Sequence, residues 1–235
     1  MAGADEQQAE RPATWGAGDI ALGIALSWIL TVFLAPVIIG VTGADSDNLP
    51  IGTIALLQIP FDGGMLAAVL YAAFAKGNGL RADFGLAFKL RDIGGFVVGV
   101  LTQYAALLVY LPFLWTDLTS SDDISKPARD LTDKAHDTWG VVLLVIIVVI
   151  MAPIVEELFF RGLVLRVLDR RFGRGWAIVG SAAIFAAAHL EPLQFPALFI
   201  FGVVAAVLAR RTGRLGPGMA AHVAFNAVAV ITLLN

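Results

Sequence analysis

The sequence predicts an all-α membrane protein, a polytopic bundle of about seven transmembrane helices with a cytoplasmic N-terminus. Hydrophobic residues make up 58% of the 235 residues and charged residues only 15%, whereas soluble domains contain about 45–50% and about 25%. Apolar runs of the roughly 20 residues that cross a bilayer core of about 30 Å recur along the whole chain. The basic residues, in addition, gather in alternate loops.

The apolar runs define seven candidate spans. They cover residues 20–41, 51–74, 93–114, 141–160, 176–190, 196–208 and 219–234. The fifth and sixth are short and joined by the tight connection EPLQF, so this pair is expected to be tilted, broken or partly re-entrant. We divide the chain into a polar tail (1–18), N-terminal transmembrane helices (19–138) and a C-terminal helical part (139–235).

The loops between these runs predict the orientation. Of the 16 basic residues, 13 lie in segments 1–18, 75–92, 161–175 and 209–218. Loops 42–50 and 115–138 are acidic, and the longer one is expected to be a solvated face. Because Lys and Arg accumulate in cytoplasmic loops, the N-terminus is predicted inside and the C-terminus outside. The tail lacks the basic stretch of a signal peptide, so the first span is expected to be retained.

Composition also excludes several classes of function. The chain has no cysteine, which excludes disulfides, thiolate metal sites and cysteine nucleophiles. A formal net charge of −3 gives no indication of nucleic-acid binding. A lipid bilayer is the expected environment.

Polar residues inside the apolar spans are the informative ones, because each charge near a span centre costs about 2.5–3.5 kcal/mol and usually marks function. The polar residues are Asp62, Gln103, Glu156, Glu157, Arg161, His189, His222 and Asn226. Each has an ordinary alternative: Asp62 beside Pro60 fits a kink or packing role, and a lone histidine or asparagine often only joins helices. The joint occurrence of Glu156, Glu157, Arg161, His189, His222 and Asn226 in three helices favours a site.

Helical spacing sorts the first cluster. Glu157 and Arg161 stand at i and i+4 and predict a structural ion pair. Glu156 lies about 100° around the helix, which leaves it free as the reactive carboxylate. Pro153 removes a backbone donor just before them, so the helix is expected to bend or open there.

The second cluster consists of His189, His222 and Asn226. His222 and Asn226 share one helix face, and both histidines lie among alanines that allow close helix packing. A carboxylate could take a proton from water while histidine and amide donors stabilise an oxyanion. Alternatively, His189, His222 and Glu156 could hold Zn²⁺, although the spacing does not match HExxH. Either arrangement predicts hydrolysis.

Three motifs then resemble one family. APIVEELFFRG (152–162) resembles the EExxxR motif of the CPBP intramembrane proteases, the CAAX prenyl protease and bacteriocin-processing family once called Abi. FAAAH (185–189) and HVAFN (222–226) resemble its FxxxH and HxxxN motifs. The resemblance covers roughly residues 139–228. His189 lies far along the fifth span, whereas His222 lies only a few residues into the last one. The fourth helix is therefore expected to continue past Arg161 toward Asp169, which would put Glu156 deeper than the hydropathy boundary suggests.

The resemblance implies an intramembrane endopeptidase of glutamate or metal-dependent type, with no cofactor required or possibly zinc. Glu156 would activate water, Glu157 and Arg161 would hold the site, and His189, His222 and Asn226 would position water or stabilise the oxyanion. The substrate would be a membrane-presented peptide or protein, a prenylated CAAX tail or a leader-bearing chain, at a bacterial inner or plasma membrane. Nothing indicates the oligomeric state.

Two other classes remain open. In a non-catalytic immunity or scaffold protein of the same fold, the polar cluster would only hold the helices together. An ion-coupled transporter would use the same buried acids, but it should show two related halves or paired broken helices, and neither is clear in the sequence.

Overall fold

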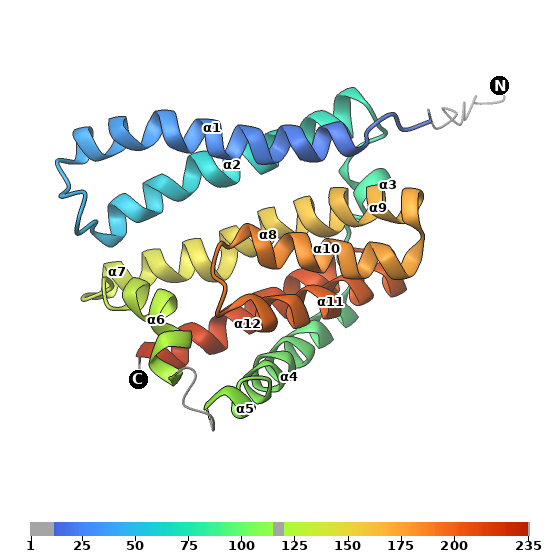
Figure 1. Cartoon of the computed structure of the whole chain (residues 1–235). Coiled ribbons are helices and arrows are strands. Elements are labelled where there is room, and N and C mark those ends of the chain that lie inside the picture. Colours follow the sequence, from blue (N-terminus) through green and yellow to red (C-terminus); the bar gives the residue numbers. More distant parts are fainter. Residues whose placement is uncertain (1–11, 115–119, 235) are drawn as a thin grey trace.

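The structure, a computed structural model, describes residues 12–114 and 120–234, and every regular element in this part of the chain is a helix (Figure 1). In order these are α1 (Ala17–Thr42), α2 (Ile51–Ala75), α3 (Leu80–Phe84), η1 (Leu90–Ile93), α4 (Gly94–Leu108), α5 (Leu111–Leu114), α6 (Ser121–Thr132), α7 (Thr138–Leu144), η2 (Val145–Met151), α8 (Ala152–Glu156), η3 (Glu157–Val164), α9 (Leu165–Phe172), α10 (Arg174–Ala188), α11 (Phe195–Thr212) and α12 (Gly216–Leu234). The predicted all-α class is confirmed. Most of the predicted polar tail, residues 1–11, lies outside the described residues.

Each predicted span corresponds to a helix, but not every helix is long enough to cross a membrane. In the described part of the chain, five helices are long and apolar enough to cross a membrane. They are α1, α2, the continuous stretch Thr138–Phe172, α11 and α12. Helices α4 and α10 have 15 residues each, about 22 Å of helix. The chain is therefore a multi-pass helical membrane protein, and seven full crossings remain a prediction.

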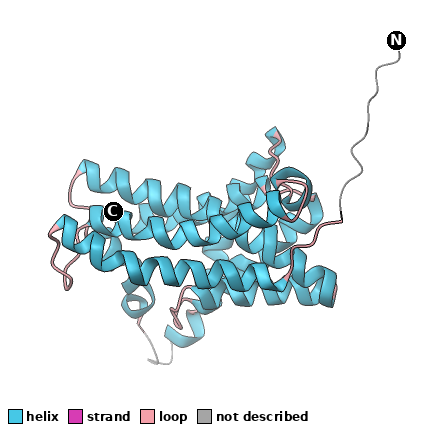
Figure 2. Ribbon diagram, turned by 90° about the horizontal axis from the view of Figure 1, so that it is seen from above, coloured by secondary structure: helices cyan, strands magenta, loops and turns pink. Residues whose placement is uncertain are grey.

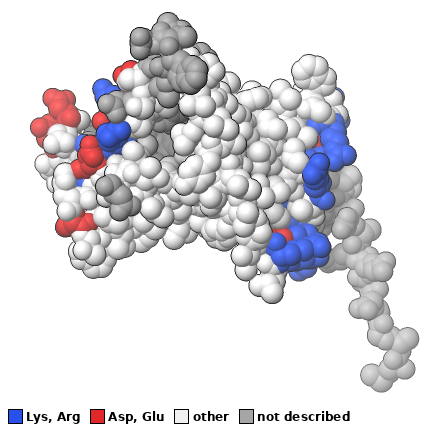
Figure 3. All heavy atoms as spheres, turned by 90° about the horizontal axis from the view of Figure 1, so that it is seen from below, with Lys and Arg blue, Asp and Glu red and all other residues white. Residues whose placement is uncertain are grey.

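The helices run lengthwise side by side (Figures 1 and 2). Helix α1 packs on α2, α4 packs on α12, and α10 packs on α11. On the face seen in Figure 3, a wide uncharged band separates one end rich in Lys and Arg from the other, which carries most of the Asp and Glu. This separation agrees with the predicted division between basic and acidic loops. The cytoplasmic position of the N-terminus remains a prediction.

The fourth predicted span is one helix of 35 residues, Thr138–Phe172. It continues well past Arg161 and ends at Phe172, so the prediction that this helix extends toward Asp169 is confirmed. Two stretches of it, η2 and η3, are π-helical, with hydrogen bonds to the fifth preceding residue, such as Ala152 N–H to the Ile147 carbonyl. Its middle is buried, and Phe159, Phe160 and Leu163 belong to the main hydrophobic core.

The depth of His222 follows from how α12 begins. Residues Gly216 to Met219, the first turn of α12, are buried, and the Leu215 N–H donates to the Gly85 carbonyl at 2.9 Å. The side chains of Arg214 and Asp92 form a buried ion pair just before this start. This contact holds the pKa of Asp92 below its usual range. Helix α12 therefore starts inside the protein, which places His222 deep despite its few preceding residues.

Helix α6 departs from the expectation of a solvated acidic loop. It carries apolar residues at Ile124, Ala128 and Leu131, an i, i+4, i+7 pattern that places them on one helix face. This face lines a cavity between the helices, while Asp123, Lys126, Arg129 and Asp130 are exposed. The sequence prediction relied on the many acidic residues of this loop and overlooked the helical spacing of its apolar residues.

Candidate active site

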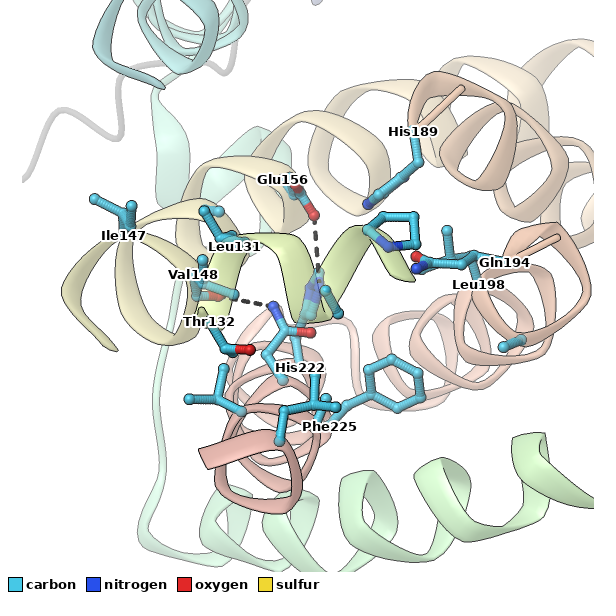
Figure 4. Close-up of a pocket in the computed structure, with 18 of the residues that line it drawn as sticks. Leu131, Thr132, Ile147, Val148, Glu156, His189, Gln194, Leu198, His222 and Phe225 are labelled. Carbon is cyan, nitrogen blue, oxygen red and sulfur yellow. Dashed lines mark hydrogen bonds and ion pairs between the residues drawn. The ribbon is translucent and has the colours of Figure 1, made fainter. Parts of the chain in front are cut away.

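A cavity of about 810 Å³ lies between the helices (Figure 4). Glu156, His189, His222 and Asn226 all line it. The structure therefore brings residues of all three sequence motifs to one place. Glu157 and Arg161 are not among the lining residues; they lie behind the cavity wall and are fully buried.

Glu156 is the carboxylate that faces the cavity. Its side chain keeps 15% of its surface exposed, and its Oε2 lies 3.5 Å from Nε2 of His222. Figure 4 shows the two side chains pointing toward one another from different helices. A separation of 3.5 Å is long for a hydrogen bond. The carboxylate can therefore turn to another donor, such as a water molecule, at little cost.

His222 stands between the two adjacent glutamates. Its Nδ1 lies 3.1 Å from Oε1 of Glu157, while Nε2 faces Glu156. Because an ionised carboxylate only accepts hydrogen bonds, Nδ1 must carry the hydrogen in this contact. The spacing argument predicted one partner for Glu157, and the structure gives it two.

The predicted pair of Glu157 and Arg161 is present, with Oε1 3.0 Å from Nη1 and both side chains inaccessible to solvent. The guanidinium lies 4.3 Å from the ring centroid of Phe185 and 5.6 Å from that of Phe201. Aromatic faces attract cations at such distances. Arg161 thus offsets the charge of the buried carboxylate and connects its own helix with α10 and α11 through the two rings.

The first turn of α12 packs directly on this pair. A Cβ added to Gly218 would stand 2.8 Å from Oε2 of Glu157. Glycine is needed there because the helix backbone approaches the carboxylate so closely. The FxxxH motif includes Phe185, but the sequence alone gave no reason to single out Gly218 or Phe201.

His189 enters the cavity from the end of α10. Its Nδ1 lies 2.9 Å from the Phe185 carbonyl, one turn earlier in the same helix. A carbonyl only accepts, so Nδ1 carries the hydrogen and the neutral ring has a free lone pair on Nε2. The chain reverses immediately afterwards, with Leu190 at φ +56°. In Figure 4 the ring points into the cavity on the side of Glu156.

Asn226 has a structural contact that spacing could not predict. Its Nδ2 donates to the Val148 carbonyl at 2.8 Å. In the π-helical register of η2, that carbonyl would accept from residue 153, which is a proline and has no N–H. The amide of Asn226 therefore satisfies the carbonyl that Pro153 leaves free, on the helix that carries Glu156 and Glu157.

This assignment predicts an energetic coupling between Asn226 and Pro153. Asn226→Ala should lower the free energy of unfolding by about 1–3 kcal/mol, because the Val148 carbonyl is left without a donor. Pro153→Ala restores a backbone N–H at that place. We expect Asn226→Ala to cost clearly less in the Pro153→Ala background, measured by denaturation in detergent.

The control for this cycle is Thr232→Ala on the same helix, whose hydroxyl bonds only its own helix at Val228. It should show no coupling to Pro153→Ala. Equal losses for Asn226→Ala in both backgrounds would contradict the assignment.

The zinc alternative does not fit the donor arrangement. Among residues 12–114 and 120–234, no group of three or more His, Asp or Glu side chains is placed to hold a metal ion. The set Glu156, His189 and His222 therefore does not form a metal site, and no step below uses a metal.

Asp62 has a packing contact of the kind expected. Its Oδ1 accepts from Nε2 of Gln58 at 2.7 Å, one turn away on α2, and the carboxylate is buried. Gln58 lines the cavity, whereas Asp62 does not. His136, in the connection between α6 and α7, is exposed.

Residues 138–228 match the protein family described as Type II CAAX prenyl endopeptidase Rce1-like. This stretch contains all three motifs and confirms the resemblance drawn from them. No curated protein and no solved structure matches the chain closely enough to count as similar.

Proposed function

We propose that the chain is an intramembrane endopeptidase of the CAAX-protease type, in which Glu156 activates water for attack on a peptide bond. One observation carries this proposal: Glu156 faces Nε2 of His222 inside a cavity into which His189 also points. The similarity of residues 138–228 to a family of prenyl endopeptidases supports the same reaction.

The charges of the site balance when His222 holds hydrogens on both nitrogens. The carboxylates of Glu156 and Glu157 are then offset by Arg161 and by the imidazolium. Buried charges are tolerated when they are paired in this way. In this state Glu156 accepts a hydrogen bond from Nε2 and remains ready to take a proton.

The reaction would begin with a water molecule bound between Glu156 and the free Nε2 of His189. Glu156 takes one proton as the water oxygen bonds to the substrate carbonyl carbon. Nε2–H of His222, released from Glu156, and the second amide hydrogen of Asn226 then point to the developing oxyanion. Glu156 returns its proton to the leaving nitrogen as the peptide bond breaks.

The substrate would be a peptide or protein presented within the membrane. Prenylated CAAX tails and leader-bearing peptides both fit this chemistry. A plasma or inner membrane location with a cytoplasmic N-terminus belongs to the same proposal. A scaffold role is less well supported, since it gives no reason for a large cavity lined by a carboxylate and two histidines.

The test uses the purified full-length chain reconstituted in phospholipid vesicles with a mixture of synthetic apolar peptides. New peptide termini should appear with the wild-type protein, and none should appear with empty vesicles or with Glu156→Gln. Termini that form equally in all three preparations would refute the proposed activity.

A further inference from the structure

Helix α6 forms one wall of the cavity that contains the catalytic groups. Six of its residues line that cavity: Ile124, Ser125, Pro127, Ala128, Leu131 and Thr132. The helix packs on α12, which carries His222 and Asn226. Figure 4 shows Leu131 and Thr132 next to Val148, the residue whose carbonyl Asn226 binds. A substrate bound at Glu156 would therefore lie against this helix.

The two faces of α6 differ in chemistry. The cavity face carries no charge and is mainly apolar, whereas Asp123, Lys126 and Asp130 on the outer face are exposed. A wall of this kind offers no partner for a charged side chain, and burying an unpaired charge is costly. Only uncharged, mostly apolar residues can occupy the space next to it.

Helix α6 also begins and ends as a defined element. Ser120 caps it, accepting from the Asp123 N–H at 3.0 Å. Nε2 of Gln194, from the connection between α10 and α11, contacts the Ile124 carbonyl at 3.4 Å. At the other end Lys134 donates to the side chain of Asn48 at 3.0 Å. These contacts hold the inner face in place over the cavity.

We propose that the inner face of α6, through Ile124, Ala128 and Leu131, determines specificity by contacting the substrate residues that flank the scissile bond. The inference rests on the proposed endopeptidase function. It assigns a substrate class, peptide segments whose residues beside the cleaved bond are uncharged and apolar. Ala128, the smallest of the three, sets how large such a residue can be.

The experiment compares the residues that flank the cleaved bonds in the same vesicle assay. Ala128→Phe narrows the cavity, so peptides with large flanking residues should lose about tenfold or more in kcat/KM while small ones remain cleaved. Leu131→Ala widens the cavity and should admit larger flanking residues. Asp130→Phe places the same phenylalanine on the outer face and should keep the wild-type preference.

The outcomes separate the two proposals. If the wild-type protein cleaves and both inner-face variants, shown to be folded by thermal unfolding, keep its preference, the inference about α6 is overturned and the proposed function stands. If the wild-type protein releases no termini, both are overturned. A preference that Asp130→Phe changes as strongly as Ala128→Phe would also overturn the assignment to the inner face.

Discussion

Glu156→Gln is expected to lower the rate of peptide hydrolysis by about 10²–10⁴-fold, the usual contribution of a general base. Glutamine has the shape of glutamate but cannot take a proton from water. The side chain lines the cavity and has only the 3.5 Å contact to His222, so little of the fold depends on it. Activity should fall while stability remains.

The measurement is kcat at saturating peptide together with the thermal midpoint of each variant in detergent. Glu156→Asp keeps the charge but withdraws it by one methylene, so it should retain more activity than Glu156→Gln. Full activity in Glu156→Gln would show that another group activates the water.

Arg161→Met should lower the free energy of unfolding by about 3–5 kcal/mol, the cost of leaving a buried charge without its partner. Glu157 would keep His222 as a partner but lose its ion pair with Arg161. The positive charge that offsets the two carboxylates of the site would then be reduced by one. The methionine fills much of the space but gives up the contacts to the rings of Phe185 and Phe201.

Arg171→Met is the matched control, because that arginine is exposed at the end of the same long helix. It should cost less than about 1 kcal/mol. Adding Glu157→Leu to Arg161→Met removes the uncompensated carboxylate and should recover part of the loss. Equal stability of Arg161→Met and Arg171→Met in denaturant titrations would contradict the structural role.

Local spacing predicted the parts of the site that depend on one helix. The pair of Glu157 and Arg161 follows directly from i, i+4 geometry, and the structure contains it. The sequence also indicated the long fourth helix, because Glu156 could lie as deep as the histidines only if that helix continued past Arg161, and the structure has one helix from Thr138 to Phe172.

The contacts between helices were beyond the sequence. The bridge from His222 to both glutamates depends on α12 starting inside the protein, which buried loop contacts decide. The bond from Asn226 to Val148 depends on a π-helical register that a period of 3.6 does not reveal. The third span was predicted as one run, 93–114, whereas α4 ends at Leu108 and a separate short helix, α5, follows it, a break that hydropathy does not reveal. The fifth span was predicted to be short, and α10 has 15 residues.

The most direct test of Glu156 as the catalytic base is a comparison of peptide termini in cell membranes that contain wild-type protein or Glu156→Gln at matched expression. The account predicts a specific set of termini that is present with the wild-type protein and missing with the variant. Identical profiles from the two membranes would contradict it, and the carboxylate would then have only a structural role.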